Sequence, residues 1–156
     1  MAAKKMAIIA TKGALDMAYP PLILASTAAA LGWEVQIFFT FYGLQLLRKD
    51  LSGIQISPLA NPAMPMPVPM PVIVSVLPGM QAMATSMMKA KMRKKGVASL
   101  TELRDLCQEA EVKFIACQMT VDLFEFSKSD FIDGIEYGGA ATFMKFAGET
   151  DVCLFI

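Results

Sequence analysis

The sequence contains no histidine, and this absence excludes several kinds of protein chemistry. A Ser-His-Asp or Cys-His catalytic unit, a zinc site with imidazole ligands and a histidine-ligated haem all require this residue. Any chemistry must therefore use cysteine, lysine, carboxylate, tyrosine or backbone groups. We predict no metal site and no cofactor.

Charged residues are also scarce, at 18% of the 156 residues, and 14 basic side chains balance 14 acidic ones. Nucleic-acid-binding proteins draw their affinity from concentrated positive charge, so the zero net charge argues against that class. Hydrophobic residues reach 55%. A monomer with so few charges has difficulty covering its surface, so we expect a homo-oligomer with apolar faces buried between subunits.

Paired cysteine motifs are absent as well. Cys107, Cys117 and Cys153 form no C-x-x-C pair, which excludes a zinc ribbon or a thioredoxin-type motif. The apolar run after Lys4 and Lys5 is too short for the core of a signal peptide. We therefore expect a cytoplasmic protein with free thiols, because the cytoplasm keeps thiols reduced.

What is present is an alternation of apolar runs and helical patterns. We expect strands at 6–11, 33–40, 72–77, 113–117 and 152–156, with a brief strand or a loop at 54–56. We expect helices at 14–32, 44–49, 78–95, 100–111 and 140–149, a helical turn from 118, and a short segment at 131–134 capped by Ser129 and Asp130. This order predicts one α/β domain over residues 1–156, with an open parallel sheet covered by helices.

Two helix starts carry local signals. Ser99 and Glu102 have the spacing of a capping box. Pro20 and Pro21 lack amide hydrogens, so the regular part of the first helix is expected to start near Tyr19.

The stretch from Leu51 to Met88 has no charged residue and includes a Pro/Met-rich segment at about 58–78. Proline at alternate positions from Pro65 to Pro71 forbids an α-helix, so we expect an extended, polyproline-like backbone there. A membrane span is not expected, because lipid requires every backbone donor and acceptor to be satisfied internally. We expect this segment to form an oligomer interface.

Cys117 ends an expected apolar strand and precedes a helical turn. Sites in open α/β sheets form at the carboxyl ends of strands, and a thiol there meets amides and a helix start that favour the thiolate. The residues alone leave two interpretations open, a reactive thiol or a core thiol, because free cysteine is often buried. Cys153, inside the final strand, is expected to be a buried core thiol.

Five phrases of the sequence match a known family. They are AIIATKGALDMAYPPLILASTAAALG, VQIFFTFYGLQLL, NPAMPMPVPMP, VKFIACQMT and DFIDGIEYGGAATFM, and the last two are the most specific. Across nearly its whole length the chain resembles the DsrE/DsrF-like sulfur-carrier family, in the branch related to membrane-associated DsrE-type sulfurtransferases. The resemblance implies a flavodoxin-like, three-layer α/β fold with an open, mostly parallel sheet of about five strands. Clean hydrophobic spans like those of the membrane-associated relatives are not found here, so a soluble form without membrane association is expected.

The resemblance also implies a function and a site. It implies a sulfur carrier or sulfurtransferase in which Cys117, the cysteine of the CQM phrase, holds sulfane sulfur as a persulfide. Rhodanese-like donors and TusA-like carriers are the partners that it implies. Cys107 is a candidate second thiol if its helix packs close to Cys117, and a packed helix thiol otherwise. The residues expected to shape the pocket of Cys117 are Tyr42, Gly43, Gln118, Met119 and Thr120.

Two other functions remain alternatives. The first is a non-enzymatic oligomeric scaffold that assembles through the Pro/Met-rich segment, and the second is a flavodoxin-like module that binds a small molecule. A basic cluster also has two interpretations, a solvated helix end or a docking patch for an acidic carrier. It consists of Lys89, Lys91, Arg93, Lys94 and Lys95.

Overall fold

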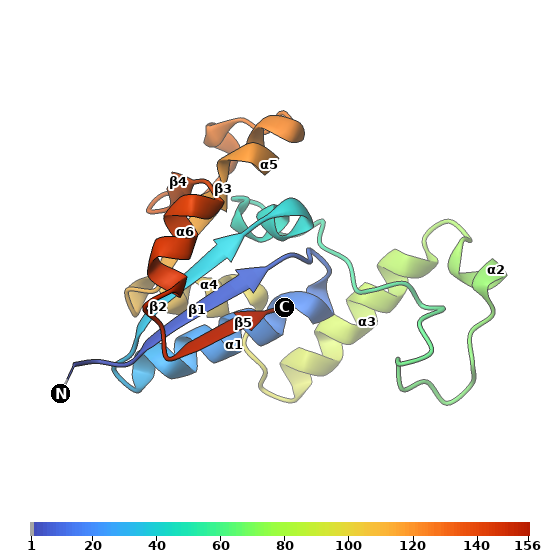
Figure 1. Cartoon of the computed structure of the whole chain (residues 1–156). Helices are drawn as coiled ribbons and strands as arrows, with labels where there is room; N and C mark the ends of the chain where they lie inside the picture. Colours follow the sequence, from blue (N-terminus) through green and yellow to red (C-terminus); the bar gives the residue numbers. More distant parts are fainter. Residues whose placement is uncertain (1) are drawn as a thin grey trace.

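Five parallel strands form the centre of the computed structural model, which describes residues 2–156 (Figure 1). They are β1 (Lys5–Ala10), β2 (Glu34–Phe39), β3 (Lys113–Cys117), β4 (Glu136–Gly138) and β5 (Val152–Phe155). Their order in the sheet is β4-β3-β2-β1-β5, which differs from the 2-1-3-4-5 order of flavodoxin. The expected α/β fold with a parallel sheet of about five strands is confirmed.

Helices lie on both faces of this sheet and give three layers (Figure 1). α1 (Leu15–Ala30) and α4 (Leu100–Glu109) pack against each other on one face, and α6 (Ala140–Ala147) covers the other. The connections from β1 to β3 step across the sheet in one direction, whereas the connection through α6 returns in the opposite direction. Right-handed crossovers therefore require α6 to lie on the opposite face from α1 and α4.

The two faces of β1 show why the sheet is covered on both sides. Met6, Ile8 and Ala10 pack in the cluster that contains the residues of α1 and α4. Ala7 belongs to a second cluster, in which Phe143 of α6 stacks on Phe38 of β2 with ring centroids 5.0 Å apart. Successive strand residues point to opposite faces, so an apolar run without polar alternation indicates a strand buried on both sides.

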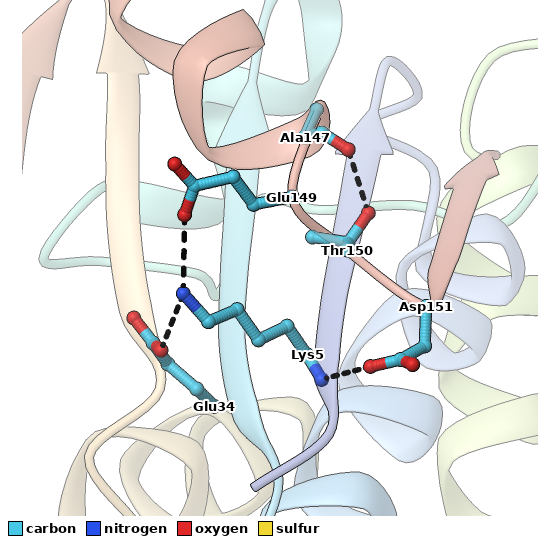
Figure 2. Close-up of polar contacts among 6 residues, drawn as sticks. All are labelled: Lys5, Glu34, Ala147, Glu149, Thr150 and Asp151. Carbon is cyan, nitrogen blue, oxygen red and sulfur yellow. Dashed lines mark hydrogen bonds and ion pairs between the residues drawn. The ribbon is translucent and has the colours of Figure 1, made fainter. Parts of the chain in front are cut away.

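Lys5 joins the amino ends of β1 and β2 to the turn that precedes β5 (Figure 2). Its Nζ lies 3.5 Å from Glu34 Oε2 and 3.3 Å from Glu149 Oε2, and its backbone amide donates to Asp151 Oδ2 at 2.8 Å. The hydrogen bond to Glu149 and the charge of Glu34 raise the pKa of Lys5. These contacts link β1 to β2 and to the turn that leads from α6 into β5.

The first helix begins earlier than expected. α1 starts at Leu15, so Pro20 and Pro21 lie inside it, and the expected start near Tyr19 is wrong. The first turn is held from outside the helix, because the Leu15 amide donates to Gln55 O at 2.8 Å and the Asp16 carboxylate accepts from the amide and hydroxyl of Ser57. These contacts hold the first turn in place, although Pro20 and Pro21 donate no hydrogen bond to the helix.

The expected strand at 72–77 is also wrong. Val72–Ser75 form one helical turn, α2, closed by a hydrogen bond from the Val74 amide to Pro71 O. β-branched residues favour strands only where a neighbouring strand can pair with them. This part of the chain projects away from the sheet, and Ile73 is 77% exposed (Figure 1). The open alternative at 54–56 is resolved as a loop.

The Pro/Met-rich segment and α3 (Met80–Lys94) form a lobe beside the sheet (Figure 1). The chain bends in two turns before the alternating prolines, from Pro58 to Asn61 and from Asn61 to Met64, and residues 65–71 contain no helical turn, as the prolines predict. Asn61 Oδ1 accepts from the Ala63 amide at 3.1 Å, which is the local bond that favours asparagine in turns. Within residues 2–156, no helix has the length and apolar character needed to cross a bilayer.

Three short elements complete the chain: the 3₁₀ helices η1 (Phe41–Leu47) and η2 (Lys128–Asp130), and α5 (Gln118–Leu123). The structure places η2 three residues before the expected segment at 131–134, with Ser127 as its cap instead of Ser129. β4 was not expected, because three residues that include Glu136 and Gly138 carry no apolar pattern. The capping box of Ser99 and Glu102 is confirmed, with the Ser99 amide donating to Glu102 Oε2 at 2.7 Å.

Candidate functional site at the carboxyl end of β3

Cys117 is the last residue of β3 and the residue from which α5 starts. In the sheet it lies opposite Gly138, the last residue of β4. After β3 the chain turns to the face of α1 and α4, where Val121 and Phe131 are buried. After β4 it turns to the opposite face, which α6 covers. The two strand ends therefore diverge at Cys117, and such switch points are where open α/β sheets form their binding crevices.

The environment of Cys117 favours its thiolate. The side chain is only 5% exposed, and burial alone would raise its pKa. Hydrogen bonds outweigh this effect and hold the pKa of Cys117 below its ordinary value; they come from the hydroxyl and amide of Thr120, the hydroxyl of Thr40 and the amide of Met119. A larger fraction of the thiol is therefore ionised at neutral pH, although the protein has no histidine to act as a base.

The two threonines are fixed by a small network. Thr40 Oγ1 and Thr120 Oγ1 are 3.2 Å apart, and the Phe41 amide donates to Thr120 Oγ1, also at 3.2 Å. Thr120 is fully buried. The Thr120 hydroxyl accepts from the Phe41 amide, so its one hydrogen can be donated in another direction, to Thr40 Oγ1 or to Sγ of Cys117.

Gly43 allows η1 to fold back onto the end of β1. A Cβ atom at this position would overlap the carbonyl oxygen of Ala10. The same carbonyl accepts from the Thr40 amide at 3.1 Å, and the Gly43 amide donates to Thr40 O at 3.0 Å. The glycine thus supports the position of Thr40, although it does not contact the thiol through a side chain.

Aromatic side chains form one side of the site. Tyr42 stacks on Phe124 with ring centroids 6.0 Å apart, and Phe41 meets Phe124 edge-on at 6.3 Å. Tyr42 is 65% exposed and Phe41 is 43% exposed. Phe41 has a left-handed backbone, with φ 48°, which is uncommon for a residue with a side chain. An exposed aromatic surface therefore lies one residue away from the Thr40–Thr120 pair.

The structure brings together some of the residues expected at this site. Thr120 and the amide of Met119 are among the groups that lower the pKa of Cys117, and Tyr42 and Gly43 lie in η1, which packs against β3. Gln118 instead donates to Asp122 Oδ1 at 2.7 Å. Sequence reasoning missed Thr40, Phe41 and Phe124. The position of Thr40 directly after β2 was a usable signal, because parallel neighbours β2 and β3 end at the same edge of the sheet.

The other two cysteines lie elsewhere. Cys107 is fully buried between α4 and α1, its Sγ donates to Leu22 O at 3.3 Å, and burial raises its pKa to about 11. It belongs to the cluster on the α1 and α4 face, whereas Cys117 belongs to the cluster on the α6 face, so the structure does not bring the two thiols together.

Cys153 is exposed, so the expectation of a buried core thiol is wrong. β5 is an edge strand, and its exposed residues alternate, with Phe155 72% exposed on the same side as Cys153. The cluster beneath α6 contains residues of β1, β2 and β3 but none of β5, so α6 leaves this face of β5 uncovered. Within residues 2–156, no group of three or more Cys, Asp or Glu side chains is placed to hold a metal ion.

Comparison with known proteins shows the family and the fold of the chain. The chain is 68% identical to the sulfur carrier protein DsrE2 of Allochromatium vinosum, and the alignment covers 100% of both chains. It is 33% identical to the uncharacterized protein YrkE of Bacillus subtilis, over 98% of this chain and 97% of that one. The crystal structure of the ychN protein from E. coli shares the fold, with a TM-score of 0.55 at 12% identity over 98% of this chain and 99% of that one. Residues 2–155 match the model of the DsrE/DsrF/DrsH-like family, and the chain belongs to that family.

Proposed function

We propose that this protein is a sulfur carrier that holds sulfane sulfur as a persulfide on Sγ of Cys117. The observation that carries this proposal is the pairing of Cys117 with two threonine hydroxyls and two amides, which lowers its pKa at the switch point of the sheet. The 68% identity to a protein named as a sulfur carrier supports the same assignment.

Loading is a thiol-exchange step. The thiolate of Cys117 attacks the outer sulfur of a donor persulfide, a new S–S bond forms, and the donor's own S–S bond breaks. The electron pair of the broken bond leaves with the donor sulfur as a thiolate, and the proton of the donor persulfide stays on the transferred sulfur. No net oxidation or reduction takes place, so neither a metal nor a redox cofactor is required.

Unloading reverses the roles. The thiolate of an acceptor attacks the outer sulfur of the Cys117 persulfide, and the Cys117 thiolate is the leaving group. The donors that lower the pKa of Cys117 stabilise this leaving thiolate, because a thiol of lower pKa leaves faster. The same hydrogen bonds therefore assist transfer in both directions, as a carrier requires.

A partner must reach a thiol that is almost fully buried. Tyr42, Phe41 and Phe124 present exposed aromatic surface beside it, and such side chains are common anchors of protein interfaces. We expect rhodanese-like donors and TusA-like carriers to contact this aromatic surface. This choice of partners follows from the family resemblance.

The test is mass spectrometry of the intact protein after incubation with a persulfide donor. Wild type is expected to gain one sulfur atom, and peptide mapping should place it on Cys117. Cys107→Ser and Cys153→Ser are matched controls that should still load, whereas Cys117→Ser should not. Cys153 is the demanding control because it is exposed. Sulfur found on Cys153, or loading that survives Cys117→Ser, would contradict the proposal.

A further inference from the structure

A cavity of about 350 Å³ lies between the start of α1, the second half of α3 and the start of α4. Its apolar walls include Leu15, Leu51 and Leu100, all of which belong to the main core. It shares no residue with the Cys117 site. Cavities that bind small molecules range from about 300 to about 1,000 Å³ and are mostly apolar, so the size and walls suit a small ligand.

Three cationic side chains line the same cavity: Lys49, Lys89 and Arg93. Lys89 and Arg93 are four residues apart on α3 and therefore project from one side of the helix. Lys49 follows η1 and approaches from a different part of the chain. In the described part of the chain, residues 2–156, none of the three forms an ion pair. Three like charges around one cavity repel each other unless an anion lies between them.

Asp50 is the one acidic side chain among the described residues that line the cavity. Its Oδ1 accepts from the Ser52 amide at 2.8 Å, and the hydrogen bonds of Ser52 lower its pKa. This carboxylate is thus held by its own loop rather than by the cations. The lining carries three positive charges against one negative charge.

The start of α4 adds two amide donors. The capping box uses the Ser99 hydroxyl for the Glu102 amide, and the Glu102 carboxylate for the Ser99 amide. The first bond of the helical ladder runs from the Leu103 amide to Ser99 O. Among residues 2–156, the intervening amides of Leu100 and Thr101 have no acceptor, and both residues line the cavity. Free amides at a helix start favour negative charge.

We propose that this cavity binds a small amphipathic anion. Its phosphate or carboxylate head meets Lys49, Lys89 and Arg93, and its apolar body lies on Leu15, Leu51 and Leu100. The basic cluster of α3 is then divided in two. Lys89 and Arg93 line the cavity, whereas Lys91, Lys94 and Lys95 do not. The proposal is independent of sulfur transfer, because Cys117 plays no part in it.

The test is calorimetric titration of the full-length protein with octyl phosphate and with octanoate, each below its micelle concentration. One saturable site per chain is expected for at least one of them, and the tighter ligand identifies the preferred head group. Inorganic phosphate and octanol, which each lack one half of the ligand, should bind more weakly. No saturable binding of either amphiphile, or octanol binding as tightly as the anions, would overturn the proposal.

Charge variants locate the site. Lys49→Met and Arg93→Met should each weaken binding by about tenfold, because a charged hydrogen bond to the head group is lost. Lys95→Met removes an exposed charge directly after α3, outside the cavity, and should leave the affinity unchanged. Asp50→Asn should strengthen binding, because it removes the opposing charge. Equal affinities of wild type and Arg93→Met would overturn the assignment to this cavity, as would a loss of binding in Lys95→Met.

Discussion

Cys117 owes its acidity to hydroxyls and amides rather than to an imidazole. Burial and hydrogen bonding act in opposite directions on its pKa, and the hydrogen bonds prevail. Threonines suit this role at a strand end, because each hydroxyl both donates and accepts and so can be fixed by the backbone while it donates. The amide of Phe41 fixes Thr120 in this way.

Thr120→Val tests the hydroxyl directly. Valine keeps the shape of threonine but cannot donate, so the pKa of Cys117 should rise and its pH–rate profile for alkylation should move to higher pH. At neutral pH the rate should fall about three- to tenfold, since less thiolate is present. Thr120→Ser retains the hydroxyl and is the matched control. An unmoved profile in Thr120→Val would show that the hydroxyl does not stabilise the thiolate.

Cys107 should behave as an inert thiol. Its burial between α1 and α4 and its pKa of about 11 leave almost no thiolate at neutral pH. We expect iodoacetamide to modify Cys153 in the native protein and to reach Cys107 only after unfolding, as mass mapping of peptides would show. Native modification of Cys107 at a rate similar to Cys153 would contradict this description of the α1–α4 interface.

The sequence correctly predicted that Cys117 is the last residue of a strand, because the end of an apolar strand is a local pattern. The sequence correctly predicted that Cys153 lies in the last strand, but its expected burial is wrong. Burial in a strand depends on what covers the sheet, and the short α6 does not cover β5. Sequence reasoning missed Thr40 because only the parallel pairing of β2 and β3 brings this residue to Cys117. Local order and the approach of Tyr42 and Gly43 to β3 were therefore predictable, whereas the individual side-chain contacts of Thr40 were not.

Among the three helices that cover the sheet, α6 is shorter than α1 and α4. It is eight residues long, and Phe143 and Phe146 are its buried side chains. Phe143 lies on Phe38 in a stacked arrangement, in the same cluster that contains Cys117. The docking of one short helix therefore controls both the packing of this face and the shielding of the thiol.

Phe143→Ala should lower the free energy of unfolding by about 3–5 kcal/mol, because a fully buried aromatic side chain is lost and leaves a cavity. Urea denaturation measures this change. Met144→Ala is the matched control on the same helix, and it should have little effect because Met144 is exposed. Cys117 alkylation should also become faster in Phe143→Ala. Similar stabilities of the two variants would contradict the role of Phe143.

Gly43→Ala should also destabilise the protein, by roughly 1–3 kcal/mol, because the new methyl group would overlap Ala10 O and push η1 away from β1. The displaced Thr40 should then raise the pKa of Cys117. Gly53→Ala is the control, since a Cβ there meets no atom within 4 Å. Thermal unfolding should separate the two variants, and equal melting temperatures would argue against the close approach at Gly43.

On the scale of the whole molecule, one group of exposed apolar side chains lies on the lobe formed by the Pro/Met-rich segment, α2 and α3. Ile73 is 77% exposed and Val76 is 73% exposed, in a stretch without charge. Isolated exposed apolar residues are ordinary, but a group of them indicates a contact surface. An oligomer interface at this lobe stays a prediction, and the sequence did not predict the helical turn at Val72–Ser75, on which Val72 and Ile73 are exposed.

A double variant tests whether subunits meet at this lobe. Ile73→Lys with Val76→Lys should convert the expected homo-oligomer into smaller species, because two charges cannot be buried unpaired in an apolar interface. Light scattering coupled to size-exclusion chromatography measures the mass. Leu31→Lys, which changes an equally exposed residue at the end of α1, is the control. An unchanged mass in the double variant would place the interface elsewhere.

The pairing of β1 with β5 has a consequence for the kinetics of folding. β1 is the first strand and β5 the last, and the bond from the Lys5 amide to Asp151 joins residues 146 positions apart. One edge of β1 can therefore form its strand pairing only with the last residues of the chain, and contacts of such long range form slowly. We expect the amides of β5 to become protected last in pulse-labelled hydrogen exchange during refolding, after those of β2. Until then β1 is an open edge, at which the nascent chain is most exposed to wrong pairing.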